Sequence, residues 1–228
     1  MYGYSLEAIR FKEDCSGSIF WMYDDTWGEV GWTIIDYYLN RKPSYYFVKR
    51  AFAPVKFIMR ESSGIVKVMG INEEPRPLDI EVEYGYLSFD GKERKTKSSL
   101  LNLQPNSREI VLEFEKSGYD LKKGVCFVKP VTVTENVLPV ILRSNVFKEL
   151  SITDVVLKVH DFAIEGGNAR FAVTSDGFAH AVHFNLGDGI RLSDEYFDLL
   201  PGESRYIAIY DVQKGYLFSQ IKAECVHC

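Results

Sequence analysis

The stretch that decides the fold is residues 20–55, FWMYDDTWGEVGWTIIDYYLNRKPSYYFVKRAFAPV, which holds all 3 tryptophans of the chain. It begins within a short apolar run, residues 18–22, of the kind that a buried parallel strand shows. Two carboxylates, Asp24 and Asp25, follow that run almost directly. The pattern predicts a strand with polar side chains at its C-terminal end, where α/β folds place ligands.

Helices are expected on both sides of this strand. Pro43 suits the first turn of a helix, and residues 44–52 place apolar side chains on one face with Lys49 and Arg50 outside it. Residues 2–14 repeat apolar side chains at spacings of three and four, which predicts an earlier helix. The first part of the chain therefore reads as helix, strand, loop and helix.

Three motifs in this part carry a resemblance. They read Trp-x-x-(Asn/Asp)-Asp-x-Trp, then (Ser/Gly)-Trp-(Ser/Thr)-x-Ile-Asp-Tyr-Tyr, then Lys-Pro-x-Tyr-Tyr-x-x-Lys-Arg-Ala-Phe-x-Pro-Val, and in this order they resemble β-mannosidases of glycoside hydrolase family two. A later phrase, LSDEYFDLLPGE at residues 192–203, resembles one in the family's last domain. Asp24 stands where the family usually has Asn, and Gly28 where it usually has Pro. The matching positions are Trp21, Asp24, Asp25, Trp27, Trp32, Ile35, Asp36, Tyr37, Tyr38, Lys42, Pro43, Tyr45, Tyr46, Lys49, Arg50, Ala51, Phe52, Pro54 and Val55.

The resemblance implies that residues 1–53 are the last helix-strand-helix portion of a catalytic (β/α)8 barrel. A whole barrel takes about 250 residues, so this portion is a fifth of one or less. The implied reaction is retaining hydrolysis of terminal β-mannosidic bonds, with a covalent glycosyl-enzyme and without cofactor or metal. The implied partners are a β-mannoside or oligosaccharide, and the missing barrel portion or a second copy of the chain.

The resemblance places both catalytic glutamates on barrel strands that would precede Met1. Glu7, Glu13 and Glu29 match neither glutamate motif, so we expect no catalytic residue in this chain. Asp24 and Asp25 do not replace them, since adjacent side chains on an extended segment point apart. The isolated chain is therefore expected to be inactive.

A substrate-binding role, restricted to an intact barrel, is implied for Trp21, Asp24 and Asp25. The resemblance makes Trp21 the floor of the subsite for the scissile sugar, and the chemistry agrees, since an indole face stacks on a pyranose and carboxylates accept hydroxyl hydrogen bonds. Asp25 has two readings, because it would orient a substrate hydroxyl or cap the backbone amides of its own loop. Without the barrel, Trp21 reads as a core strand residue.

The pattern changes after Pro54, where alternating, β-branched runs are separated by turn signals. Such spacing is typical of β-sandwiches, and Asp90-Gly91 is a strong hairpin signal. We expect a mainly β fold with two immunoglobulin-like β-sandwiches, at residues 54–143 and 144–228, after the α/β remnant. The helix of residues 44–52 runs straight into Pro54, so residues 1–53 are expected to pack against the first sandwich or against a second copy of the chain. Residues 134–151 would join the sandwiches, with Val140, Ile141 and Leu142 available for an edge strand.

Composition narrows the functional classes. A net charge of -5 argues against nucleic acid, which prefers a basic surface. No apolar run approaches a membrane span, and residues 1–14 lack the apolar centre of a signal peptide, so the expected location is cytoplasmic. With aromatic residues at 14%, a carbohydrate-binding module is an alternative class, and a structural or interaction module is another.

The cysteines and histidines give no strong site. Cys225 and Cys228 have metal-like spacing but no second pair, whereas structural zinc takes four ligands, so we expect two free thiols there. Cys15 and Cys126 are expected to be small buried residues. His180 and His183 are expected at the surface on opposite faces of one strand.

Overall fold

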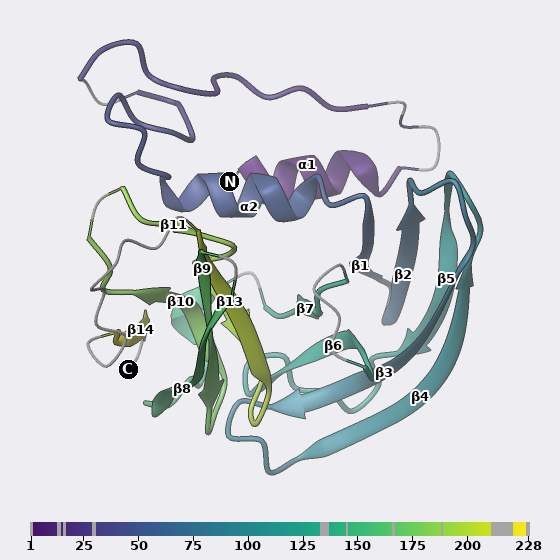
Figure 1. Ribbon diagram of the computed structural model, residues 1–228. Coiled ribbons are helices and arrows are strands. Elements are labelled where there is room, and N and C mark those ends of the chain that lie inside the picture. Colours follow the sequence, from purple (N-terminus) through teal and green to yellow (C-terminus); the bar gives the residue numbers. More distant parts are fainter. Residues whose placement is uncertain are drawn as a thin grey trace. The chain divides into compact units, whose positions relative to one another are not determined.

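The computed structural model describes residues 2–12, 15, 17–28, 31–132, 137–144, 146–165, 167–187, 189–210 and 221–226. The fold is mainly β, with several antiparallel sheets (Figure 1). Contacts divide the chain into two compact units. The N-terminal sandwich unit comprises Ser5–Ser18 and Phe52–Ile152, and the C-terminal sandwich unit comprises Met1–Tyr4, Ile19–Ala51 and Thr153–Cys228. In the described ranges, neither α-helix has the length and apolarity of a membrane span.

Two antiparallel sheets form the N-terminal sandwich unit. One has the order β1-β2-β5, with β1 at Val55–Ser62, β2 at Ile65–Asn72 and β5 at Ser107–Glu115. The other has the order β4-β3-β6-β7, with β4 at Arg94–Leu103, β3 at Leu78–Ser88, β6 at Gly124–Pro130 and β7 at Val140–Leu142. One buried cluster draws apolar side chains from both sheets, including Phe57, Val68, Val82, Leu103 and Cys126. A short helix, η1, follows at Phe147–Glu149.

Sequence signals located most of these strands. The Asp90-Gly91 prediction is confirmed, since β3 and β4 pair across it and Gly91 has a φ of 72°. The short apolar run after Pro139 is β7, at the edge of its sheet. Strand β4 begins well before its first apolar residue, Leu100. Its first half is largely exposed and carries polar residues. Exposed positions on an edge strand need no apolar side chains, so the apolar pattern does not predict the first half of β4.

Helix α1 (Tyr2–Arg10) is shorter than the predicted 2–14. Phe11, which follows it, packs with Ile58, Met69 and Ile71 on the face of the β1-β2-β5 sheet away from the sandwich core. Arg10 donates to Ala53 O at 3.3 Å and pairs with Glu73 at 2.7 Å. Both faces of β1 are therefore covered, which explains its unbroken buried run from residue 55 to 59.

The C-terminal sandwich unit also contains two antiparallel sheets. The first has the order β11-β13-β9-β8, with β11 at Arg191–Leu192, β13 at Ser204–Tyr210, β9 at Asn168–Ser175 and β8 at Leu157–Glu165. The second has the order β12-β10-β14, with β12 at Phe197–Leu199, β10 at Ala179–Phe184 and β14 at Ala223–Val226. Their shared core includes Phe171, Val182, Phe197, Leu199 and Ile207. These sheets confirm the mainly β sandwich class, while the barrel remnant and the predicted domain boundaries stay predictions.

The predicted strand at residues 18–22 is wrong. These residues form no regular structure, and Ile19 and Trp21 are 97% and 75% exposed. A buried parallel strand needs a paired strand on each side. The described residues supply only isolated bridges near this segment, from Ile35 to Asp24 and to Arg41. An apolar run without neighbouring strands stays irregular, and Trp21 is accordingly no core residue.

Helix α2 (Pro43–Ala51) confirms the second predicted helix, but its expected partner is wrong. The sequence suggested packing on the sandwich that directly follows in the chain. Instead, α2 belongs to the C-terminal sandwich unit and contacts the segment between β11 and β12. Nearness in sequence was a poor guide here, because charged side chains 144 residues apart determine the contact.

Three smaller predictions also need correction. His180 and His183 lie on the same side of β10, off the core face, because a register shift with a positive φ of 55° at Ala181 inserts an extra residue. Both rings are half-buried rather than fully exposed. Cys225 is disulfide-bonded and not a free thiol, while Cys228 lies outside the described residues. Cys126 is buried as predicted, whereas Cys15 is only half-buried.

Candidate functional site

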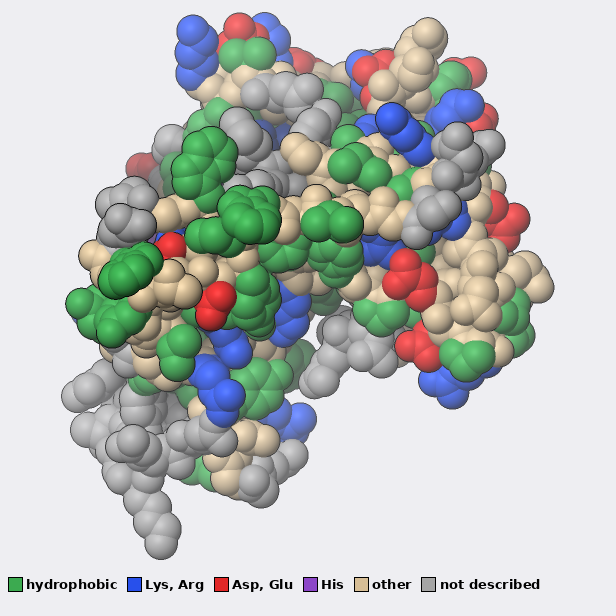
Figure 2. All heavy atoms as spheres, turned by 90° about the horizontal axis from the view of Figure 1, so that it is seen from above, with side chains coloured by type: hydrophobic (Ala, Val, Ile, Leu, Met, Phe, Trp, Pro, Cys, Tyr) green, Lys and Arg blue, Asp and Glu red, His purple; other side chains and the backbone are tan. Residues whose placement is uncertain are grey.

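The segment before α2, residues 21–38, is here called the aromatic loop. Its large side chains are strongly exposed, and hydrophobic groups gather on the face seen in Figure 2. Monomeric proteins seldom expose so much contiguous apolar surface unless it binds something. The aromatic side chains of the loop that are 52–78% exposed are Trp21, Tyr23, Trp27, Trp32, Tyr37 and Tyr38.

Asp25 is buried at the base of the aromatic loop. Its Oδ2 accepts hydrogen bonds from Thr33 Oγ1 at 2.6 Å and from Lys42 Nζ at 2.9 Å. Lys42 Nζ also lies 2.6 Å from Thr33 Oγ1, which closes a three-residue network. The hydrogen bond from Thr33, followed by that from Lys42, lowers the pKa of Asp25 below its ordinary 3.8. Asp25 is thus an anionic anchor that joins the start of the aromatic loop to Thr33 within it and to Lys42 after it.

Gly31 is required by this anchor. A Cβ built at Gly31 would lie 2.2 Å from Asp25 Oδ1, which is closer than real Cβ contacts. Any other residue here would displace the carboxylate from Thr33 and Lys42. The glycine is therefore explained by the close approach of a buried carboxylate to the backbone.

The three predicted sugar-binding residues are not equivalent. Trp21 and Asp24 are exposed, whereas the carboxylate of Asp25 is turned inward to Thr33 and Lys42. Adjacent aspartates thus point apart, as the sequence indicated. Their exposure leaves Trp21 and Asp24 accessible to a ligand, while Asp25 supports the loop that presents them.

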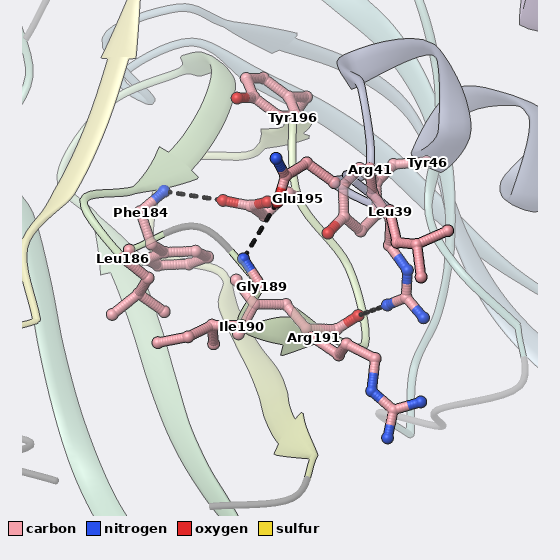
Figure 3. A pocket seen from close by; sticks show the side chains of 13 residues that line it. Leu39, Arg41, Tyr46, Phe184, Leu186, Gly189, Ile190, Arg191, Glu195 and Tyr196 are labelled. Atoms are coloured by element: carbon pink, nitrogen blue, oxygen red, sulfur yellow. Dashed lines mark hydrogen bonds between the residues drawn. The ribbon is translucent and has the colours of Figure 1, made fainter. Parts of the chain in front are cut away.

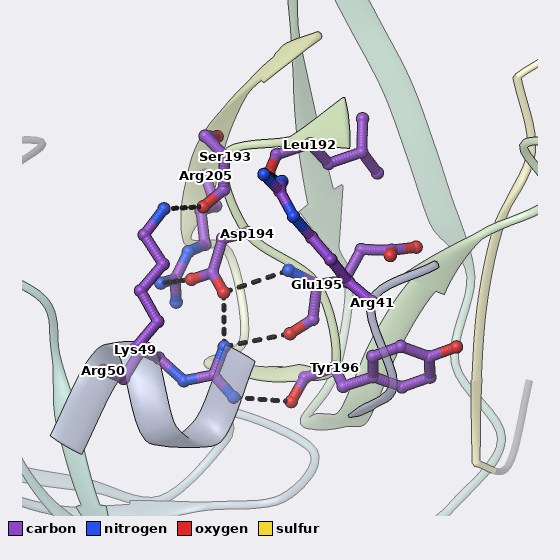
Figure 4. Close-up of polar contacts among 9 residues, drawn as sticks. All are labelled: Arg41, Lys49, Arg50, Leu192, Ser193, Asp194, Glu195, Tyr196 and Arg205. Atoms are coloured by element: carbon purple, nitrogen blue, oxygen red, sulfur yellow. Dashed lines mark hydrogen bonds and ion pairs between the residues drawn. The ribbon is translucent and has the colours of Figure 1, made fainter. Parts of the chain in front are cut away.

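Helix α2 is fastened to the C-terminal sandwich unit by a polar cluster that Figure 4 shows. The guanidinium of Arg50 pairs with Asp194 and donates to Glu195 O at 2.9 Å and Tyr196 O at 3.0 Å. Lys49 Nζ donates to Ser193 O at 2.6 Å. A second guanidinium, from the half-buried Arg205, also pairs with Asp194. These contacts lie in the LSDEYFDLLPGE phrase that the sequence had singled out without a role.

Beside this cluster lies a cavity of about 140 Å³, drawn in Figure 3. Its walls come from the turn before α2, from α2 itself and from the segment that connects β10 to β12. Both walls of the cavity carry polar groups. The described residues that line it are Leu39, Asn40, Arg41, Tyr46, Phe184, Leu186, Gly187, Gly189, Ile190, Arg191, Leu192, Glu195 and Tyr196.

Glu195 is the acidic group of this cavity. Its carboxylate accepts a hydrogen bond from Phe184 N at 3.2 Å and bonds the hydroxyl of the fully buried Tyr46. Burial raises the pKa of Glu195 above its ordinary 4.5, although these two hydrogen bonds oppose the shift. Burial likewise raises the pKa of Tyr46, with Glu195 adding to the effect.

Arg41 supplies the positive charge of the cavity, and Asn40 supplies an amide. Arg41 donates to Leu192 O at 3.2 Å, and its guanidinium lies 4.7 Å from the centre of the Tyr45 ring. Asn40 Oδ1 accepts from Gly189 N at 3.1 Å. Sequence reasoning missed this cavity, because its two walls are separated by more than a hundred residues, and the motifs that hold Tyr46 and Glu195 do not show that these residues meet.

No metal centre is seen in the part of the chain that the structure describes, since no three His, Cys, Asp or Glu side chains come together there as ligands. His180 Nδ1 instead lies 2.6 Å from Asp198 Oδ1. His183 stacks on Tyr196, with ring centres 5.3 Å apart and planes inclined by 10°. Both histidines therefore have structural partners within the sandwich.

Comparison with known proteins first defines a class. A family model of an immunoglobulin-fold domain of mannosidases matches residues 150–221. Exo-chitosanase from Amycolatopsis orientalis is 16% identical with a TM-score of 0.65, covering 91% of this chain and 30% of that one, which is a likeness of fold alone. Residues 150–221 are therefore similar to the immunoglobulin-fold domain of mannosidases.

A more specific likeness covers nearly the whole chain. The β-D-mannosidase from Dictyoglomus thermophilum is 28% identical with a TM-score of 0.85, over 99% of this chain and 28% of that one. β-Mannosidase B from Aspergillus flavus is 23% identical over 94% of this chain, and that from Aspergillus niger is 23% identical over 92%. The chain is β-mannosidase-like, and it resembles a C-terminal portion of such enzymes. It spans 28% of the length of the Aspergillus flavus relative.

Proposed function

We propose that this chain works as the C-terminal part of a β-mannosidase-like glycoside hydrolase, which releases terminal β-linked mannose with retention of configuration. The observation that carries the proposal is the structural match to the Dictyoglomus thermophilum β-D-mannosidase, which extends over 99% of the chain. The match includes the aromatic loop and α2, and so is not limited to the sandwich that the family model covers.

In this proposal the aromatic loop serves as the sugar platform, the surface on which the sugar ring stacks. Trp21 is 75% exposed, so its indole can stack on the apolar face of a pyranose. Asp24 is exposed beside the loop and can accept hydrogen bonds from sugar hydroxyls. Asp25 acts as a positioning residue through Thr33 and Lys42, because its carboxylate is already bound to both.

The two catalytic carboxyl groups belong, in this proposal, to a barrel portion outside these residues. Retaining enzymes hold such groups about 5–5.5 Å apart on either side of the scissile bond. Asp24 and Asp25 cannot serve as this pair, since one is exposed and the other points into its own loop. The barrel portion is thus also the proposed partner that covers the aromatic loop.

A chimeric enzyme tests this function. The 28% of the Dictyoglomus thermophilum β-D-mannosidase that matches this chain is replaced by residues 1–228, and hydrolysis of an aryl β-mannoside is measured. We expect a folded, active chimera, no turnover by the isolated chain, and a loss of roughly tenfold or more in kcat/KM for Trp21→Ala, corresponding to one stacked aromatic group.

The control is Trp27→Ala, which changes an equally exposed indole that the proposal does not place against the sugar. Equal losses for the two variants would remove the platform role from Trp21. A folded but inactive chimera would contradict the proposal itself. Turnover by the isolated chain that disappears in Asp24→Ala would show that catalysis lies within these residues.

A further inference from the structure

We infer that the cavity beside α2 is a second binding site, distinct from the Trp21 platform, for a neutral polyhydroxylated ligand of monosaccharide size. The cavity lies wholly within the C-terminal sandwich unit. It does not involve the aromatic loop residues Trp21, Asp24 or Asp25. Nothing in the proposed reaction uses it.

The size of the cavity sets the size of the ligand. A single water needs about 10–15 Å³ of such volume, so 140 Å³ holds on the order of ten water-sized groups. A hexose has a comparable number of heavy atoms, whereas a disaccharide would extend well outside. The cavity is therefore matched to one sugar ring or a similar small polyol.

The charges of the cavity select a neutral ligand. Glu195 contributes a carboxyl group and Arg41 a guanidinium group. Glu195 and Arg41 both line the cavity, where Figure 3 shows the first bonded to Phe184 N and the second to the carbonyl of Leu192. A free anion would meet Glu195, and a free cation would meet arginine, so neither charge is favoured.

The hydrogen-bonding groups fit hydroxyls. Glu195 accepts and Arg41 donates, so an acceptor and a donor line the cavity, beside Asn40, whose amide already accepts from Gly189 N and donates to Asp36. A sugar hydroxyl also donates and accepts, which lets one ligand bond both Glu195 and Arg41. Charged carboxyl and guanidinium groups hold such hydroxyls more strongly than neutral groups do.

Aromatic rings complete the site. Tyr196 is half-buried at the cavity and is fixed by its stack on His183 and by its contact with the Tyr46 ring at 6.1 Å. Phe184 lies on another wall. A rigid ring next to convergent polar groups offers the apolar C–H face of a sugar a surface to pack on.

The test is a titration of the full, ¹⁵N-labelled chain with D-mannose. The reporters are the amides of Phe184 and Gly189, which donate to Glu195 and Asn40 in the cavity. We expect both amides to shift with a dissociation constant on the order of 1 mM, as suits one small ligand in a shallow site. Glu195→Gln should weaken binding by about tenfold, since it removes one charged hydrogen-bond partner.

Two matched variants separate this site from others. Glu224→Gln makes the same chemical change at a carboxylate that is 58% exposed and does not line the cavity, so binding should be unchanged. Trp21→Ala should also leave it unchanged. If Glu195→Gln gives a perturbed amide spectrum, Arg41→Lys is used, because it keeps the charge and removes the guanidinium fork.

Several outcomes would overturn the inference. Phe184 and Gly189 amides that do not respond to mannose would exclude the site. Sodium acetate that shifts the same amides as strongly as mannose would make it an anion site. Binding that is lost in Trp21→Ala and kept in Glu195→Gln would assign the sugar to the platform, supporting the proposed function while removing the second site.

Discussion

The guanidinium of Arg50 and the carboxylate of Asp194, 144 residues apart in the chain, form an ion pair whose side chains are only 17% and 11% exposed. Arg50 also donates to two backbone carbonyls of the same segment. This one residue therefore sets where α2 lies within the C-terminal sandwich unit. Its importance can be measured.

We expect Arg50→Ala to reduce the free energy of unfolding by about 3 kcal/mol, the lower end for breaking a buried ion pair, because Arg205 still neutralises Asp194. Lys67→Ala is the control, since its pair with Glu113 is half-exposed on both sides and worth at most about 1 kcal/mol. Urea unfolding followed by circular dichroism measures both. Equal effects would show that Arg50 does not fix α2.

Gly31→Ala should loosen the aromatic loop, because the new methyl group would collide with Asp25. We expect faster proteolytic cleavage within residues 21–42 and loss of activity in the chimeric enzyme. Gly17→Ala is the matched control, since a Cβ there meets nothing within 4 Å. Identical cleavage of the two variants would mean that Asp25 does not anchor the loop.

The pKa of Asp25 predicts how its contribution depends on pH. The folded pKa is lowered below 3.8, so the stabilisation is present above pH 3.8 and is lost as the pH falls through the lower, folded value. Asp25→Asn should therefore be less stable than the parent at neutral pH, and the difference should shrink in acid. Urea unfolding at a series of pH values tests this, and a gap independent of pH would contradict it.

Glu195 should behave in the opposite way. Its folded pKa is raised above 4.5, so its favourable contribution is present below pH 4.5 and is lost as the pH rises through the higher, folded value. Glu195→Gln, which cannot ionise, should gain stability relative to the parent as the pH increases. The same unfolding series, extended to neutral pH, would refute this if the parent gained instead.

The exposed aromatic loop predicts self-association of the isolated chain. Apolar surface that is normally covered favours contact with a second copy, and burying one large aromatic side chain is worth roughly 1.5–3 kcal/mol. We expect a dimer in sedimentation experiments, weakened in the Trp27→Ser, Trp32→Ser double variant. Leu100→Ser, which changes a side chain that is 68% exposed on β4, should have no effect. A monomer at all concentrations would rule out self-association through the aromatic loop.

The strands were largely predictable from sequence because their signals are local. Alternating residues and turn pairs such as Asp90-Gly91 fix a strand and its hairpin without reference to the rest of the chain. The segment 18–22 failed for the opposite reason, since an apolar run becomes a parallel strand only when neighbours pair with it. His180 and His183 were misassigned because one inserted residue at Ala181 reverses the expected alternation.

The candidate site was only partly predictable. Motif resemblance singled out Trp21, Asp24 and Asp25, and simple geometry correctly separated the two aspartates. The inward partners of Asp25 and the cavity around Glu195 depend on contacts between distant residues, such as Arg41 with Leu192. No local periodicity encodes such contacts, and without them the second helix was assigned to the wrong sandwich.

The alternation of the chain between its two units has a consequence for biosynthesis. Ser5–Ser18 and Phe52–Ile152 can complete their unit while the ribosome is still adding the last strands. Residues 19–51 cannot, because Ser193, Asp194 and the carbonyls that receive Arg50 emerge far later. The aromatic loop and α2 therefore lack these contacts until residues 193–196 have been synthesised, and such non-local contacts form slowly while exposed apolar side chains are prone to aggregate.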